Sequence, residues 1–101
     1  MLGLPIDFDS YWKPEAMQGC DKFYVDDENQ FEYYRTVGYF KGAPKAFADM
    51  GQLLTGRVPG RESEKERIIG MNLGLAIMDI ATGIRIYRRA LEKGIGTKLP
   101  L

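Results

Sequence analysis

The sequence contains no histidine and only one cysteine among its 101 residues. Without a nearby imidazole to activate it, Cys20 is a poor candidate for a catalytic nucleophile. A single cysteine also cannot form an internal disulfide, and the N-terminus lacks the basic-then-apolar order of a signal peptide. These absences predict a reducing, cytoplasmic location.

The chain has no excess of charge, since 14 basic side chains balance 14 acidic ones. No block of lysine and arginine offers a footprint for a phosphate backbone, so we expect no nucleic-acid partner. The longest apolar stretch, from Ile68 to Ile84, includes Asn72 and Asp79 and is shorter than the roughly 20 residues that a bilayer requires. It predicts a buried helix and no membrane span.

The first third of the chain alternates strand and helix signals. Leu4 to Asp9 alternates apolar and polar side chains after the proline, which predicts a short strand. Pro14 is well placed in the first turn of a short helix. Lys22 to Val25 has high β propensity and predicts a second strand. The sequence then favours a helix from Glu28 onward.

Three consecutive acidic residues, Asp26, Asp27 and Glu28, allow two interpretations. Asp26 or Asp27 could cap the helix that follows, because a carboxylate there accepts free backbone N–H groups. The three could also bind a hard cation, but no histidine is present and the spacing is not that of a calcium loop. Helix capping is the favoured interpretation.

The middle of the chain is rich in turn residues. Residues 38–44 predict a loop, and Ala46 to Leu54 predicts another short helix. Arg67 to Met71 could be a strand or the first turn of the next helix, with the strand slightly favoured. Alternating strands and helices with short connections predict an α/β fold with parallel strands.

The last helix has the clearest pattern. Its apolar residues recur at spacings of four and three, which places them on one face: Leu73, Ile77, Ile80, Ile84, Tyr87 and Leu91. Small or apolar residues on the other faces from Met71 to Ala81 predict that the first half is buried all round. Asp79 in that half is either an ion-pair partner or a functional carboxylate. Gly94 is expected to end the helix.

Ordered motifs along nearly the whole chain resemble the C-terminal part of the ornithine cyclodeaminase and mu-crystallin family. The resemblance rests on the Asp26-Asp27 strand ending and on four later motifs: Met50-Gly51-Gln52-Leu53-Leu54, the Gly-Arg pairs at 56–57 and 60–61, Gly74-Leu75-Ala76 with Asp79, and Gly94-Ile95-Gly96. The segment PIDFDSYW is similar to a bacterial subgroup that carries a tyramine oxidase label. That label is no evidence of oxidase chemistry.

The resemblance implies a homodimeric enzyme of amino-acid metabolism, about three times this length, with a central Rossmann domain. Such enzymes bind NAD and oxidise an amino acid to an imine with loss of ammonia, or reduce a cyclic imine. A Rossmann site needs a glycine-rich turn and an acidic residue about 20 positions later. This chain contains neither, so it is expected not to bind NAD tightly, or to catalyse, alone.

The resemblance also assigns candidate site residues. Asp7 matches the catalytic aspartate, with Asp9 as a rival because the segment is shorter than the family's. Asn72 is matched to cofactor binding, and Leu73 and Gly74 to substrate binding, at what would be the start of the last helix. No metal ligand is expected.

These observations predict a C-terminal fragment of a Rossmann-like domain with two or three short strands and a long C-terminal helix. Residues 1–60 would end the Rossmann-like domain, and residues 61–101 would return to a substrate and dimerisation domain. The partner would be an upstream polypeptide or a second copy, and the substrate an amino acid or a cyclic imine. The alternative is a non-catalytic oligomerisation module that uses the apolar face of the last helix.

Overall fold

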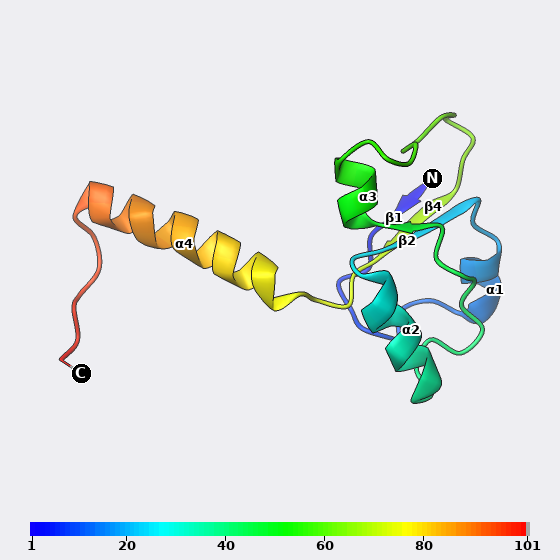
Figure 1. Ribbon diagram of the computed structural model, residues 1–101, viewed down its shortest axis with the longest axis horizontal. Coiled ribbons are helices and arrows are strands. Elements are labelled where there is room, and N and C mark those ends of the chain that lie inside the picture. Colours follow the sequence, from blue (N-terminus) through cyan, green and yellow to red (C-terminus); the bar gives the residue numbers. More distant parts are fainter. Residues whose placement is uncertain (101) are drawn as a thin grey trace.

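The computed structural model describes residues 1–100 and contains a four-stranded parallel sheet flanked by helices (Figure 1). The strands lie in the order β1-β4-β2-β3. In chain order the elements are β1 (Leu2–Gly3), α1 (Pro14–Gln18), β2 (Lys22–Val25), α2 (Glu28–Thr36), β3 (Ala48–Asp49), α3 (Met50–Leu54), β4 (Ile68–Met71) and α4 (Ala76–Lys93). The predicted α/β fold with parallel strands is confirmed, with four strands in place of two or three.

The two central strands, β2 and β4, determine the sheet. Every residue of both strands is buried, and the pairing places Tyr24 opposite Gly70 and Val25 opposite Met71. Parallel sheets are normally covered on both faces, which explains why β4 and residues 23–25 of β2 show no alternation of apolar and polar side chains. The strand favoured at Arg67 to Met71 is therefore confirmed.

Two apolar clusters lie on opposite faces of the sheet. The larger contains Met17 of α1 and Phe31 of α2, packed with Phe23, Val25 and other residues of the sheet and loops. The smaller is built from Tyr24, Ala48 and Ile68, with Met50 and Leu53 of α3 packed against it. The sheet thus carries α1 and α2 on one face and α3 on the other (Figure 1).

Two predicted elements differ in the structure. The strand expected from Leu4 to Asp9 is absent, because Asp7 closes a turn by accepting the Ser10 N–H, and pairing with β4 occurs earlier, at Leu2–Gly3. The helix expected from Ala46 to Leu54 is divided between β3 and α3. Ala48 pairs beside Tyr24 and is fully buried, while the Asp49 side chain caps α3 by accepting the Gln52 N–H at 2.8 Å.

The last helix, α4, begins later than predicted and lacks the expected burial. It starts at Ala76, after Gly74 with φ of +93°, and ends at Gly94 in the left-handed conformation, as predicted. No residue of α4 is buried, because the helix extends away from the sheet and no described element covers it (Figure 1). No helix within residues 1–100 is long and apolar enough to cross a membrane.

The sheet includes residues on both sides of the predicted division at residue 60. β4 (Ile68–Met71) lies between β1 and β2, so the part of the chain after residue 60 first completes the sheet and then continues into α4. The assignment of residues 61–101 to a separate substrate and dimerisation domain stays a proposal about α4 and its partner.

Candidate functional site

Two segments that are far apart in the sequence meet at the carboxyl ends of β1 and β4. These strands are neighbours in the sheet, so the chain that leaves each of them emerges at the same edge. Residues 5–8 after β1 and residues 72–74 after β4 line one open hollow of about 330 Å³. Ligands of open parallel sheets bind outside the carboxyl ends of the strands, which makes this hollow the candidate site.

Asp7 is the charged residue of this hollow. Its Oδ2 accepts hydrogen bonds from the Ser10 hydroxyl at 2.6 Å and from the Ser10 N–H at 3.0 Å. The Ser10 hydroxyl, helped by backbone N–H groups, holds the pKa of Asp7 below its ordinary value of 3.8. The carboxylate is therefore ionised at neutral pH, and Oδ1 remains available to accept a proton or attract a cation.

Asp9, the rival of Asp7, has a different place. Its Oδ1 accepts the Phe40 N–H at 2.8 Å, and it does not line the hollow. Phe40 is buried and has a left-handed backbone with φ of +50°, a conformation that needs support in a residue with a bulky side chain. The Asp9 carboxylate therefore stabilises the turn at Phe40, while Asp7 faces the hollow.

The matched residues Asn72, Leu73 and Gly74 lie in the loop between β4 and α4, not at the start of the helix as expected. The reason is their backbone hydrogen bonding: the N–H groups of Leu73 and Gly74 donate to the Asp26 Oδ2 at 2.9 and 2.7 Å. These donors are thus already used, and a pyrophosphate could not bind to them. The Asn72 side chain is exposed and contributes a polar group to the hollow.

Asp26 is the functional candidate that the sequence does not distinguish. The structure separates it from its neighbour: Asp27 caps α2 by accepting the Gln30 N–H at 2.7 Å, as expected of one of the pair, whereas Asp26 is only 5% exposed and binds the loop after β4. A signal was available, because a carboxylate that directly follows a fully buried strand needs donors from elsewhere.

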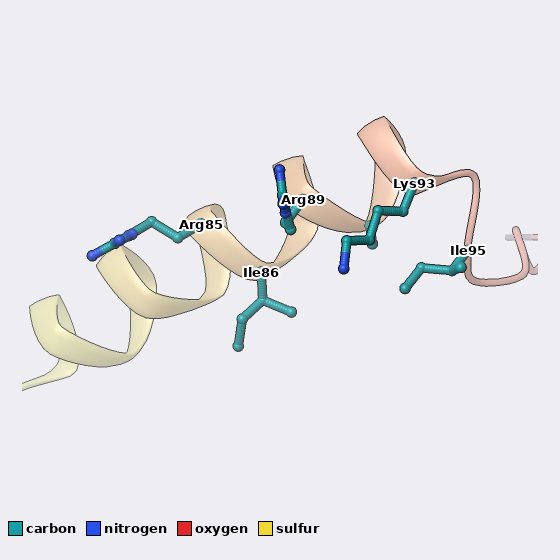
Figure 2. Close-up of a pocket in the computed structure, with 6 residues that line it drawn as sticks. Arg85, Ile86, Arg89, Lys93 and Ile95 are labelled. Atoms are coloured by element: carbon teal, nitrogen blue, oxygen red, sulfur yellow. The ribbon is translucent and has the colours of Figure 1, made fainter.

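Two of the other hollows are larger but less suited to a reaction. One, of about 490 Å³, lies along α4 and the chain after it, and its lining includes Arg85, Arg89 and Lys93 but no acidic or nucleophilic group (Figure 2). The other, of about 450 Å³, is apolar and lies on the face of the sheet beside α3, bounded by Leu2, Leu4 and other residues. Both surfaces suit packing against a partner more than chemistry.

The acidic residues do not form a metal site within residues 1–100, where no group of three or more cysteine, aspartate or glutamate side chains is arranged around a common point. Asp79, the candidate ion-pair partner or functional carboxylate, forms no ion pair with the described residues. It lies exposed in the first turn of α4, where a carboxylate interacts favourably with the helix dipole.

The sequence of the chain is similar to those of known proteins. Residues 8–94 match the ornithine cyclodeaminase/mu-crystallin family. The chain is 42% identical over 75 residues to a Delta(1)-pyrroline-2-carboxylate reductase of Bacillus cereus, covering 74% of this chain and 23% of the relative. It is 46% identical over 93 residues to an N-((2S)-2-amino-2-carboxyethyl)-L-glutamate dehydrogenase of Staphylococcus aureus, covering 86% of this chain and 28% of the relative.

A solved structure extends the likeness to the fold. An archaeal alanine dehydrogenase dimer with bound NAD matches 99% of this chain and 33% of its own chain, with a TM-score of 0.68 and 26% sequence identity. The predicted Rossmann-like character of the sheet is thereby confirmed. The chain spans 23% and 28% of the two curated relatives, so these proteins contain much that has no counterpart here.

Proposed function

The chain belongs to the ornithine cyclodeaminase/mu-crystallin family, and on that premise we propose that it forms the substrate-facing part of an NAD-dependent oxidoreductase acting on an amino acid or a cyclic imine in the cytoplasm. The observation that carries the proposal is the meeting of Asp7 with Asn72, Leu73 and Gly74 around one hollow at the carboxyl ends of β1 and β4.

The hollow fits the ring end of a dinucleotide better than its pyrophosphate. Its walls include the apolar side chains of Ile6, Phe8 and Leu73, with polar groups from Asp7 and Asn72. Such a surface suits a flat ring with one polar edge. The donors that a pyrophosphate would require are absent, since Asp26 already accepts the N–H groups of Leu73 and Gly74.

The residues of the hollow have complementary roles in the proposed chemistry. A bound nicotinamide would supply hydride transfer. The ionised Asp7 accepts a proton from the substrate nitrogen during oxidation of an amino acid, and in the opposite direction it attracts the positively charged iminium carbon–nitrogen group. Asn72 offers an amide for hydrogen bonding, and Leu73 limits access of water.

The proposal predicts how the chain responds to NADH. Titration of the 101-residue chain alone, followed by calorimetry and nicotinamide fluorescence, is expected to show no saturable micromolar binding, because the sequence contains no glycine-rich pyrophosphate turn. Assembly with a polypeptide that carries such a turn is expected to restore binding and to allow NADH-dependent reduction of Δ1-pyrroline-2-carboxylate. Saturable binding by the chain alone would contradict the proposed division of the site.

A second candidate function, pairing of two copies through α4, is favoured by one observation. The apolar stripe of α4 is exposed along its whole length, and its spacings of three and four are those of a helix–helix seam: Ile77, Ile80, Ile84, Tyr87 and Leu91. Basic residues gather toward the end of α4, whereas Asp79 is near its start. An antiparallel arrangement would separate the basic ends of the two copies.

This pairing predicts a matched difference between two substitutions on α4. Ile84→Glu places a charge in the stripe and is expected to weaken the dimer by about 3 kcal/mol or more over two copies, at least about a hundredfold in Kd. Met78→Glu, on the opposite side of the helix and outside the hollow of Figure 2, is the control and should leave the dimer intact. Light scattering across a concentration series measures both. A monomeric wild-type chain, or equal effects of the two substitutions, would exclude the pairing.

A further inference from the structure

We propose that Asp26 is a positioning residue that fixes the loop carrying Asn72, Leu73 and Gly74 against Asp7; the inference rests on the proposed function for its catalytic consequence. Asp26 directly follows β2, and β4 lies between β2 and β1 in the sheet. Asp26 does not line the hollow itself. It therefore acts through the loop and not on a substrate.

The Asp26 carboxylate connects two separate segments of the chain. Its Oδ1 accepts the N–H of the adjoining Asp27 at 3.1 Å, and its Oδ2 accepts the N–H groups of Leu73 and Gly74 at 2.9 and 2.7 Å. All three partners are backbone donors, and Asp26 forms no ion pair within residues 1–100. A buried carboxylate is retained only where such donors are arranged for it.

Both backbone polar groups of Gly74, the N–H and the carbonyl, form hydrogen bonds with side chains. Its N–H donates to Asp26, and its carbonyl accepts a longer hydrogen bond, 3.3 Å, from the Gln30 side chain of α2. Its φ of +93° is a conformation that favours glycine. The start of α2 and the end of β2 thus determine how the chain leaves β4, and with it the position of Asn72 and Leu73 in the wall of the hollow.

Substitutions at Asp26 can test whether its carboxylate oxygens hold the loop, because they remove or alter the hydrogen-bond acceptors. Asp26→Ala removes the acceptors for all three N–H groups. Asp26→Asn keeps the shape and one oxygen but replaces the other oxygen with an NH₂ group, which would face a donor. The neighbouring Asp27→Asn is the matched control, because it makes the same chemical change at a residue that caps α2, and asparagine caps helices about as well as aspartate.

The test uses amide hydrogen exchange by NMR in the 101-residue chain. In Asp26→Ala, the Leu73 and Gly74 amides should exchange about tenfold faster or more, while amides in the β2–β4 ladder, such as that of Ile69, keep their protection. Asp26→Asn should give an intermediate effect and Asp27→Asn none. Unchanged exchange at Leu73 and Gly74, or an equal loss of protection throughout the sheet, would overturn the proposal.

The catalytic consequence is measured in the NADH-dependent assembly with Δ1-pyrroline-2-carboxylate. A displaced loop should raise KM about tenfold in Asp26→Ala while kcat changes less, with partial recovery in Asp26→Asn. An equal fall in kcat and kcat/KM would instead make Asp26 part of the reacting group and overturn the positioning role. If the wild-type assembly lacks activity, the proposed function fails, and the exchange experiment still decides whether Asp26 holds the loop.

Discussion

Asp7→Asn is expected to lower kcat of the NADH-dependent assembly by about a hundredfold to a thousandfold, the range for losing one preorganised group that stabilises charge in the transition state. Asparagine keeps the shape of the side chain and can still accept from Ser10, so the turn should persist. What is lost is the negative charge and the ability to take a proton. Steady-state kinetics with Δ1-pyrroline-2-carboxylate measures the effect, and the KM for NADH should change little.

Asp9→Asn is the matched control for Asp7. The new amide oxygen can still accept the Phe40 N–H, so the fold and the activity should both be largely kept. Loss of activity in Asp9→Asn with retention in Asp7→Asn would reverse the assignment of the two carboxylates. Circular dichroism of both variants verifies that neither effect comes from unfolding.

The role proposed for Asp7 also predicts how activity depends on pH, because the Ser10 hydroxyl affects the pKa of Asp7. It is the main group that lowers the pKa of Asp7, so Ser10→Ala should raise that pKa toward its ordinary value of 3.8. Since Asp7 must be ionised to attract the iminium group in the direction of reduction, the acidic limb of the pH–rate profile should move to higher pH. Activity at neutral pH should remain. An acidic limb that does not respond to Ser10→Ala would show that another group controls it.

The contrast between β2 and β3 indicates which elements the sequence can predict. Lys22 to Val25 has enough consecutive β-prone residues to be recognised alone, and α2 is indicated by its acidic cap. β1 and β3 have only two residues each, and they exist because the edges of β4 and β2 pair with them. Local propensity contains no information on such pairing, so it misplaces the first strand and extends a helix over β3.

The site shows the same limit. Resemblance offers Asp7, with Asp9 as a rival, and Asn72, Leu73 and Gly74 as candidates. Only the topology places Asp7 and residues 72–74 around one hollow. Asp26 and its neighbour are equivalent in the sequence because either could cap α2; which one turns toward β4 depends on tertiary contacts. The apolar stripe of α4 is evident from its spacing, but its burial requires a partner surface that residues 1–100 do not provide.

Phe31→Ala is expected to destabilise the chain by about 3–5 kcal/mol, the usual cost of truncating a buried phenylalanine. Phe31 has no exposed surface, and its ring centre lies 5.7 Å from that of Phe23 and 5.2 Å from that of Phe40, so its loss leaves a cavity between α2 and the sheet. Small domains are stable by only about 5–15 kcal/mol, so a large part of the free energy of unfolding would be lost.

Urea unfolding followed by the fluorescence of Trp12, which packs against the same core, measures the change. Tyr33→Ala is the control on the same helix, because Tyr33 is 62% exposed and its truncation should cost about 0.5 kcal/mol or less. Equal effects of the two substitutions would contradict the packing of α2 on the sheet. Since α2 also carries Asp27 and Gln30, partial unfolding of Phe31→Ala should release the loop at Gly74 together with the core.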